Sequence, residues 1–481
     1  MSSILRSIIS DIGHNELFRQ TRYEEKSQFL RLHIGTHSYQ VTNYSRTGLA
    51  FQATKEASFD ISQSIEDIKI KFSDDEVFSG SINIKSVTNE GESILIGAMF
   101  MKTVFPTEKL IAAQAKNDLL KQIDVEMKEL QEVNKEACKL IIDCARFLQM
   151  FTDKCEAFEK QLIGKTYDSC QSAEAAFMEY MAPVATDYLV EFNAKFSSII
   201  DVDSIMEGSA YHRIFGQLIY PFFDGSDLAR RAKDKPLGYA GDFEMMNQIY
   251  RNGYEGKTLV GKILHNYVAN EKSSESVSFR KPYFLSYYEK SLEEAKGNDI
   301  NILSLASGPC VEFQNAIEKY DQETLSKINL TLFDLDQVSL EHAQTKIYEK
   351  SIEQQKSINI EFINASVKLF IESSNQKNTE YYDLVYSGGL FDYLDNATST
   401  AIVTNLFNFI KPGGRVIIGN FTQKNSTKAF CHFVTNWHLI HKTEEEMRAW
   451  TKYLPKNSYH LKIDYDDNGI NAFLVLEKPR E

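Results

Sequence analysis

From residue 301 onward, short apolar runs alternate with segments of helical composition, and this alternation restricts the fold more than any other feature. The runs are strand-length and rich in β-branched and aromatic residues: INILSLA, INLTLFDLD, INIEFIN, YYDLVYSG, RVIIGNF and AFLVLE. Strands that alternate with helices build a parallel sheet with helices on both faces. We therefore expect an α/β domain over residues 296–481 with a Rossmann-like, doubly wound sheet.

Small and polar residues follow these runs where each one ends. They are Ser307, Gly308 and Pro309 after the first run, Asp334 and Asp336 after the second, Asn364, Ala365 and Ser366 after the third, and Ser387 and Gly388 after the fourth. Open α/β sheets bind ligands at the carboxyl ends of their strands, where an acidic residue accepts the ribose hydroxyls. The G-x-G-x-x-G dinucleotide motif is absent. The position of Asp334 or Asp336 at the end of the second run, after the glycine turn, suits a nucleoside.

These residues, together with Lys411-Pro412-Gly413-Gly414 before the fifth run, resemble the class I S-adenosylmethionine-dependent methyltransferases. The resemblance covers roughly residues 300–478 and implies S-adenosylmethionine as the cofactor. It implies that Ser307, Gly308 and Pro309 hold the methionine part and that Asp334, with Asp336 beside it, holds the ribose. It also places Asn364 to Ser366 beside the adenine, and Ser387 with Gly388 in the cofactor wall.

A second motif, KPLGYAGDFEMMNQIY, lies in a mostly helical stretch over residues 166–295, and NWHLIHKT follows near Trp437. Both resemble the bacterial branch associated with 3-hydroxypalmitate methyl ester (extracellular factor) biosynthesis. That resemblance implies a helical cap over an acyl substrate, with Tyr239 and Asp242 near the methionine end of the cofactor. Relatives that share the loop also perform intramolecular cyclisation, which releases methylthioadenosine. The alternative for Asp242 is an N-cap of the following helix.

Methyl transfer depends on positioning and on the exclusion of water more than on acid or base catalysis. A carboxylate acceptor would be held by an arginine, and the candidates are Arg213, Arg230 and Arg280. Aromatic faces that could favour the sulfonium are those of Tyr239, Tyr283 and Tyr393. For an amine or hydroxyl acceptor, the candidate bases are His212 and Asp242. Tyr239, Asp242 and Arg213 are the catalytic candidates, and solvated or structurally paired arginines are the alternative.

Residues 29–105 contain six β-rich runs, which predict a small β-barrel over residues 1–106. The segment VTNYSRTGLAF, with Asn43, Ser45 and Gly48, resembles the second signature of PilZ domains. That resemblance implies binding of cyclic di-GMP, with Arg19 and Arg22 gripping the nucleotide, although they stand one residue closer than the usual R-x-x-x-R. A purely structural module is the alternative.

No glycine or proline occurs from Thr107 to Leu162, so residues 107–165 predict one or two long helices. Apolar residues recur there at heptad spacing: Leu120, Ile123, Met127, Leu130, Ala137, Ile141, Cys144, Leu148 and Phe151. Asn134 would occupy an a position, which favours an in-register, parallel homodimer. An amphipathic helix packed on its own chain is the alternative.

Charge and cysteine usage exclude several classes of protein. The formal net charge of -14 disfavours nucleic acid as a partner, and six cysteines without a C-x-x-C pair are typical of reduced thiols. His432, His438 and His441 lack the i, i+4 spacing of a helical metal site, so no metal is expected. The sequence contains no predicted membrane span.

We expect a cytoplasmic methyltransferase for a small molecule, with an acyl carboxylate as the favoured acceptor. The alternatives are a cofactor cyclase and a non-catalytic cyclic di-GMP adaptor.

Overall fold

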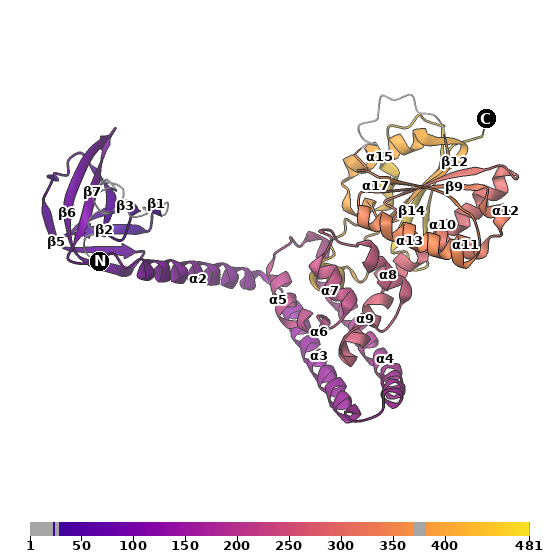
Figure 1. Cartoon of the computed structure of the whole chain (residues 1–481), viewed down its shortest axis with the longest axis horizontal. Helices are drawn as coiled ribbons and strands as arrows, with labels where there is room; N and C mark the ends of the chain where they lie inside the picture. Colours follow the sequence, from indigo (N-terminus) through magenta and orange to yellow (C-terminus); the bar gives the residue numbers. More distant parts are fainter. Residues whose placement is uncertain (1–22, 25–27, 369–380, 481) are drawn as a thin grey trace, which may run out of the picture. The chain divides into compact units, whose positions relative to one another are not determined.

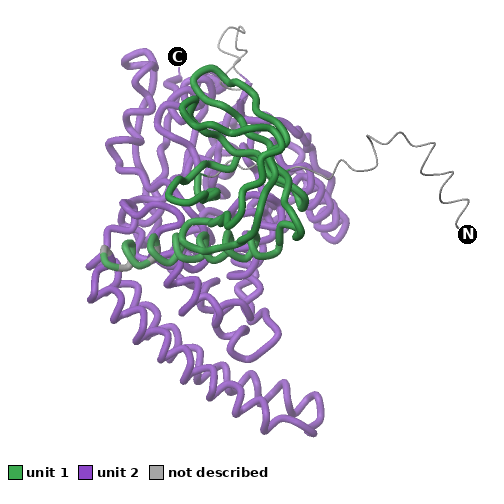
Figure 2. Tube along the Cα trace, turned by 90° about the vertical axis from the view of Figure 1, so that its left-hand side faces the viewer, with its two compact units in different colours: residues 1–132 green, residues 133–481 purple. Residues whose placement is uncertain are grey.

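The computed structural model describes residues 23–24, 28–368 and 381–480, in two compact units, 1–132 and 133–481, which are coloured separately in Figure 2. Arg19 and Arg22 of the predicted nucleotide site lie outside the described residues. Within the described ranges, no helix combines the length and the apolar character that crossing a bilayer requires. Each unit is described by itself below.

The first unit contains the predicted β-barrel (Figure 1). Six antiparallel strands close on themselves in the order β3-β2-β5-β6-β7-β4, because β4 also pairs with β3. The strands are β2 (Leu30–Ile34), β3 (His37–Tyr44), β4 (Gly48–Thr54), β5 (Ser64–Phe72), β6 (Asp75–Glu90) and β7 (Ser93–Met101), with the short β1 (Tyr23–Glu24) beside β3. Closure leaves few free strand edges, and the inward side chains form the unit's core. The six β-rich runs of the sequence correspond to these six strands.

The Asn43, Ser45 and Gly48 motif builds the turn between β3 and β4. The Ser45 backbone N–H donates to the Gly48 carbonyl oxygen at 2.8 Å, and Ser45 is buried. A Cβ atom on Gly48 would lie 2.5 Å from the carbonyl oxygen of Ala98, so only glycine fits there. The motif therefore has a structural role in the barrel.

The predicted heptad seam is interrupted at Asn134, which corrects the placement of that residue inside a continuous coiled coil. Helix α2 (Thr107–Glu132) ends before it and α3 (Lys135–Leu162) begins after it. The Asn134 side chain caps α3 by accepting hydrogen bonds from the backbone N–H groups of Glu136 (2.9 Å) and Ala137 (3.2 Å). An N-cap needs extended backbone dihedrals, so this residue cannot also be a mid-helix knob.

The apolar face of α3 packs within its own chain. Ala137, Ile141, Cys144 and Leu148 share a buried core with side chains of α4 (Tyr167–Ile199). The rings of Phe147 and Tyr188 stack with centroids 3.8 Å apart. For α3, the alternative of an amphipathic helix packed on its own chain is therefore confirmed.

A group of further helices follows α4 in the second unit, and most of them lie at one end of the sheet (Figure 1). They are η1 (Val202–Ser204), α5 (Ala210–Leu218), α6 (Tyr220–Phe223), α7 (Asp227–Asp234), α8 (Phe243–Arg251), α9 (Leu259–Asn270) and α10 (Lys272–Ala295). Their core also includes Phe430 and Phe433 of α16 (Lys428–Phe433), which follows the sheet in sequence. These helices, residues 202–295, are called the cap below.

The second unit also contains the predicted doubly wound sheet, in the strand order β10-β9-β8-β11-β12-β14-β13. The strands are β8 (Ile300–Leu305), β9 (Ile328–Asp334), β10 (Asn359–Asn364), β11 (Tyr382–Ser387), β12 (Ile410–Phe421), β13 (His460–Tyr465) and β14 (Asn471–Glu477). The first five in chain order, β8 to β12, are parallel, as expected, but β14 pairs antiparallel with both β12 and β13. The sequence prediction missed β13, whose HLKIDY pattern alternates because it is an edge strand with one exposed face.

Helices cover both faces of this sheet. Alternate residues of the parallel strands enter two separate cores: Ile302 and Leu384 on one face, and Leu303 and Val385 on the other. The first core includes α10, α11 (Val311–Lys319), the short α12 (Gln322–Leu325) and α13 (Gln337–Glu353). The second includes η2 (Phe391–Tyr393), α15 (Asn396–Phe409) and α17 (Glu444–Ala449). The strand order reverses between β8 and β11, so their carboxyl ends flank the position where a ligand can enter.

Candidate functional site

A cavity of about 480 Å³ lies at this reversal, between the carboxyl ends of the strands and the cap. Its size is that of an ordinary small-molecule site. The sheet side contributes Ser304, Ala306, Ser307, Gly308, Pro309, Glu312, Asp334, Leu335, Asp336, Ser339, Val367, Tyr386, Gly388, Gly389, Leu390 and Tyr393. The cap side contributes Leu237, Tyr239, Ala240, Gly241, Phe243, Met246, Tyr250, Arg280 and Phe284. Six predicted cofactor residues therefore meet here: Ser307, Gly308, Pro309, Asp334, Asp336 and Gly388.

The turn after β8 has an unusual backbone. Ala306, Gly308 and Cys310 have φ values of 52°, 54° and 46°. Left-handed dihedrals cost about 1 kcal/mol for a residue with a Cβ atom, so Ala306 and Cys310 hold strain of the kind found at binding sites. A Cβ atom on Gly308 would have no heavy atom within 4 Å, and the residue lines the cavity. The turn therefore leaves open space beside its backbone for a ligand.

The Asp334 carboxylate ties this turn to the end of β9. One oxygen accepts a hydrogen bond from the Gly308 backbone N–H at 3.0 Å, and the other accepts one from the Asp336 N–H at 3.0 Å. Burial raises the pKa of Asp334, while these backbone donors oppose that rise. Each oxygen keeps a second lone pair, so the carboxylate can still accept from a ligand hydroxyl.

The GYAGD loop rests on the same edge of the sheet. The Tyr239 hydroxyl donates to an Asp336 carboxylate oxygen at 2.6 Å, and the Tyr393 hydroxyl donates to the Ala240 carbonyl oxygen at 3.1 Å. Trp437 Nε1 donates to the Tyr393 hydroxyl at 2.6 Å. Burial and the Asp336 carboxylate raise the pKa of Tyr239, so its phenol keeps its proton. The loop is thus a fixed wall of the cavity.

Asp242, a predicted catalytic residue, is instead the N-cap of α8. Its carboxylate accepts hydrogen bonds from the Met245 backbone N–H and from Arg231 Nε, each at 2.8 Å. The side chain is 2% exposed and does not line the cavity. The N-cap alternative is therefore confirmed. The carboxylate is occupied by the start of α8 and by Arg231, so it does not face the cavity.

Arg213 also lies outside the residues that line the cavity. It belongs to α5, and its Nη1 donates to the Gly208 carbonyl oxygen at 2.7 Å. Arg230 pairs with Asp227 at 2.6 Å, and the Tyr283 hydroxyl donates to Asp464 at 2.9 Å, so neither faces the cavity. The structure therefore brings only Tyr239 of the three catalytic candidates to the cavity.

The end of β10 supports the cavity from behind. Asn364 Nδ2 donates to the carbonyl oxygens of Asp334 (3.1 Å) and Leu335 (2.9 Å), and the Ala365 N–H donates to the Asp334 carbonyl oxygen at 3.1 Å. Asn364, Ala365, Ser366 and Ser387 are absent from the cavity lining, whereas Val367 is part of it. The sequence correctly predicted where β10 ends, but the residue that reaches the cavity is Val367 and not one of residues 364–366.

Two buried charged side chains in the cavity wall stand out. Arg280 of α10 is 7% exposed, lies 3.4 Å from an Asp392 oxygen, and has an Nε atom without a hydrogen-bond partner. Glu312, in the first turn of α11, accepts a hydrogen bond from the Tyr386 hydroxyl at 2.7 Å, and burial raises its pKa. Sequence reasoning named Arg280 only as one of three arginines and missed Glu312. An acidic residue at a helix start right after the strand turn is the pattern that could have identified it.

Buried polar atoms test the fit of a cofactor like S-adenosylmethionine. Ser307, Ser339 and Arg280 line the cavity, and the hydroxyl oxygens of the two serines and the Nε atom of Arg280 are buried without a hydrogen-bond partner among the described residues. Buried polar groups usually have partners, so these atoms indicate a polar ligand. The carboxylates of Asp334 and Asp336 can accept hydrogen bonds from a sugar diol, and Arg280 and Glu312 can bind the two charges of a zwitterion. This set of groups matches a nucleoside that carries an amino acid.

No protein-family model matches the chain, and no curated protein is significantly similar to it. Among solved structures, a protein from Bordetella parapertussis is similar at 16% identity over 66% of this chain and 100% of that chain, with a TM-score of 0.42. Magnesium protoporphyrin IX methyltransferase from Synechocystis PCC 6803 with bound SAH is similar at 8% identity over 52% of this chain and 100% of that chain, with a TM-score of 0.34. An S-adenosylmethionine-dependent methyltransferase from Methanosarcina mazei is similar at 17% identity over 38% of this chain and 94% of that chain, with a TM-score of 0.27. Each TM-score lies below 0.5, so the function must be inferred from the residues of the site.

Proposed function

We propose that this protein is an S-adenosylmethionine-dependent methyltransferase that acts on a small molecule. The observation that carries the proposal is the Gly308 turn, which the Asp334 carboxylate holds at the point where the strand order reverses. Open space beside Gly308 and an oriented carboxylate are what a nucleoside needs at this edge. In this assignment Asp334 and Asp336 accept the ribose hydroxyls.

The zwitterionic end of the cofactor would meet Arg280 and Glu312. The guanidinium donates to a carboxylate, and the Glu312 carboxylate accepts from an ammonium group. When bound, S-adenosylmethionine supplies an electrophilic methyl group on a sulfonium. The rings of Tyr250, Phe284 and Tyr393 line the cavity, where they exclude water and favour a positive charge.

The cavity favours an acceptor that is already nucleophilic. In the described part of the chain, no histidine lines the cavity, and Tyr239 keeps its proton. A carboxylate acceptor needs no base, because it is ionised at neutral pH. The apolar side chains of Leu237, Phe243 and Met246 on the cap side suit the hydrocarbon part of an acyl acceptor.

Mass spectrometry of the protein incubated with S-adenosylmethionine, with and without medium-chain and 3-hydroxy fatty acids, tests the activity. We expect S-adenosylhomocysteine and a methyl ester only when the acid is present. Methylthioadenosine without an acceptor would identify the cyclase instead. No turnover together with no cofactor binding would contradict the proposal and favour the non-catalytic adaptor.

A glycine pair tests the site itself. Gly308→Ala places a methyl group in the cavity, so we expect calorimetry to show at least tenfold weaker binding of S-adenosylhomocysteine. Gly297→Ala is the matched control, because Gly297 also has a positive φ, 91°, and open space around it but does not line the cavity. Equal loss of affinity in both variants would contradict the assignment of the turn.

Regulation by cyclic di-GMP is the remaining part of the proposal, and its support is the barrel with its Asn43, Ser45 and Gly48 turn. An effector changes activity only by binding two states differently. We expect calorimetry of the full chain to show nucleotide binding, and Arg19→Ala with Arg22→Ala to remove it. Absence of heat at high micromolar nucleotide, or identical turnover with and without it, would contradict regulation.

A further inference from the structure

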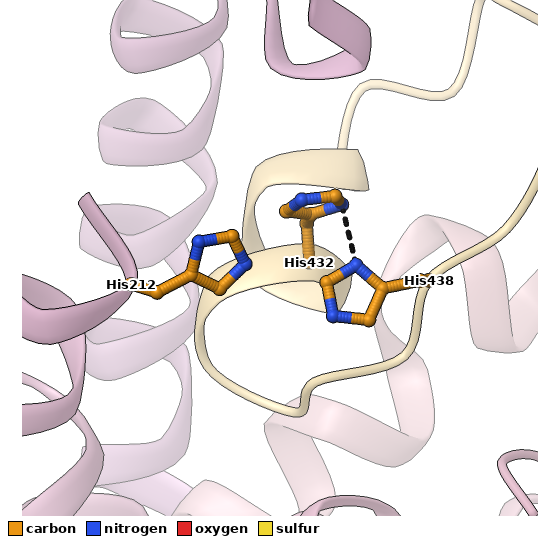
Figure 3. A group of neighbouring side chains, drawn as sticks. All are labelled: His212, His432 and His438. Atoms are coloured by element: carbon orange, nitrogen blue, oxygen red, sulfur yellow. Dashed lines mark hydrogen bonds between the residues drawn. The ribbon is translucent and has the colours of Figure 1, made fainter. Parts of the chain in front are cut away.

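Three histidines from separate segments meet in the second unit, away from the cavity (Figure 3). His212 lies on α5, His432 lies on α16, and His438 lies in the segment after α16. One ring nitrogen of each lies within 4.8 Å of those of the other two, and the Nδ1 atoms of His432 and His438 are 3.0 Å apart. None of the three lines the cofactor cavity.

The hydrogen bonds of these rings leave nitrogen lone pairs unused. Ser209 Oγ lies 3.1 Å from His212 Nδ1, and the Asn436 side-chain oxygen is bonded to His438 Nε2. That oxygen can only accept, so His438 Nε2 carries the proton, and His438 Nδ1 accepts a hydrogen bond from the His432 Nδ1–H at 3.0 Å. The Nε2 atoms of His212 and His432 are buried without a partner among the described residues.

The one carboxylate in ion-pair range of the cluster is that of Glu207, 3.7 Å from His438 Nε2 and largely exposed, as far as the described residues go. Three imidazoles held this close together are a ligand set that a borderline-soft metal ion prefers.

We propose that His212, His432 and His438 bind a divalent transition-metal ion, with Zn²⁺ as the favoured ion and Glu207 or water as the fourth ligand. Zn–N bonds of about 2.0–2.1 Å in a tetrahedral site place ligand nitrogens roughly 3.3 Å apart. The observed nitrogen separations, from 3.0 Å up to 4.8 Å, bracket this value. Ligation by His432 Nδ1 would require the proton of that ring to move to Nε2. Helix spacing in the sequence could not show this site, because its ligands come from different segments.

The site would fasten the segment after α16 to the cap. Trp437 adjoins His438, and its Nε1 donates to the Tyr393 hydroxyl in the cavity wall. A metal that holds His438 to His212 would therefore stabilise that wall without touching a ligand in the cavity. The site is structural in this assignment and takes no part in methyl transfer.

Cobalt titration of the full chain, after removal of metals with a chelator, tests the proposal. We expect one Co²⁺ per chain with the visible absorption bands of a tetrahedral ion, displaced by one equivalent of Zn²⁺. His432→Gln and His438→Gln should each weaken Co²⁺ binding by at least about tenfold. His460→Gln is the control, because His460 is exposed on β13 and should leave binding unchanged.

X-ray absorption of the Zn²⁺-loaded wild-type protein gives a result that does not depend on whether the variants fold. We expect scattering from three imidazoles and one oxygen and no sulfur in the coordination sphere. Sulfur ligands would assign the metal to cysteines and overturn the proposal. Failure to bind Co²⁺ or Zn²⁺ at stoichiometric concentration, or equal binding by the wild type and by both His→Gln variants, would also overturn it.

Discussion

At the scale of single residues, Asp334 shows how a buried carboxylate can organise a binding site before any ligand arrives. Its two backbone hydrogen bonds fix the Gly308 turn against β9 and orient the remaining lone pairs toward the cavity. An oriented acceptor loses less entropy on binding than a mobile one. The same carboxylate therefore fixes the turn and supplies the proposed ribose contact.

Asp334→Asn tests this double role. An amide offers one oxygen, so its NH₂ group would face a backbone N–H of Gly308 or Asp336. We expect S-adenosylhomocysteine to bind about 10- to 100-fold more weakly in calorimetry, the equivalent of roughly 1.5–3 kcal/mol. Asp321→Asn is the control, since Asp321 caps α12 outside the cavity lining and should leave the affinity unchanged. Unchanged binding by Asp334→Asn would remove the residue from the site.

Glu271 gives a prediction about pH. It is 5% exposed at the start of α10, and burial raises its pKa from 4.5 to about 7. In the unfolded chain the group loses its proton near pH 4.5, whereas in the folded chain it keeps the proton until about pH 7. Stability from this group is therefore complete below pH 4.5 and falls as the pH rises to about 7, by about 3 kcal/mol in total.

Urea denaturation across pH 4.5–8 measures that loss. Glu271→Gln cannot ionise, so the variant should show a smaller decline in the free energy of unfolding over this range. If the free energy of unfolding declined equally with pH in the wild type and the variant, ionisation of Glu271 would not lower the stability of the fold, which would contradict the prediction. Glu275→Gln on the exposed side of the same helix is the control, because its partly exposed carboxylate pairs with Lys272 at 2.7 Å.

The residues that the sequence identified correctly are those whose positions follow from strand ends. Gly308 and Asp334 come directly after apolar runs, and parallel strands bring their carboxyl ends together. Arg280 and Glu312 could not be singled out, because burial depends on how the cap packs on the sheet. Asp242 was predicted to be catalytic because the resemblance of its GYAGD loop implied a place near the cofactor, yet the carboxylate caps α8 and pairs with Arg231 inside the cap.

At the scale of elements, the absence of glycine and proline correctly predicted helices, but the heptad spacing did not show the break between α2 and α3. Spacing reports which side chains share a face and does not report where a backbone leaves the helix. Asn134 can serve either as an a-position residue or as an N-cap, and the structure uses it as a cap. Edge strand β13 was missed for a similar reason, since six alternating residues fit several structures.

Asn134→Ala distinguishes these two roles. Loss of the bonds to the Glu136 and Ala137 N–H groups should lower the free energy of unfolding by about 1 kcal/mol, as for other N-caps. Urea denaturation gives that value, and sedimentation equilibrium should show the same oligomeric state as the wild type. A change of oligomeric state would instead support a core position in a coiled coil.

The GYAGD loop is an element whose shape depends on one glycine. Gly241 has a φ of 72°, and a Cβ atom there would lie 2.6 Å from the Tyr393 hydroxyl. Gly241→Ala should separate Tyr393 from Ala240 and Trp437, weaken S-adenosylhomocysteine binding at least fivefold, and change the tryptophan fluorescence. Gly238→Ala is the control, because Gly238 also has a positive φ, 84°, but has open space around it. Equal effects of the two substitutions would indicate backbone strain alone.

At the scale of the whole molecule, the chain joins a barrel unit that ends with α2 to a unit that contains the cap and the sheet. The sequence indicated the barrel and the sheet, because both are built from short runs with clear boundaries. The homodimer stays a prediction, and the heptad residues Leu120, Ile123 and Met127 of α2 now carry it. Their exposed fractions are 52%, 44% and 54%.

Substitution of these three residues by glutamine tests the dimer. Exposed apolar side chains at heptad spacing are stabilised when a second copy covers them, so we expect the wild-type chain to be dimeric in sedimentation equilibrium at micromolar concentration. Leu120→Gln, Ile123→Gln and Met127→Gln together should raise the dimer dissociation constant at least tenfold. Ile142→Gln is the control, because Ile142 on α3 is equally exposed, 44%, but lies off the seam. A monomeric wild type, or dissociation by the control alone, would assign the exposed face of α2 another role.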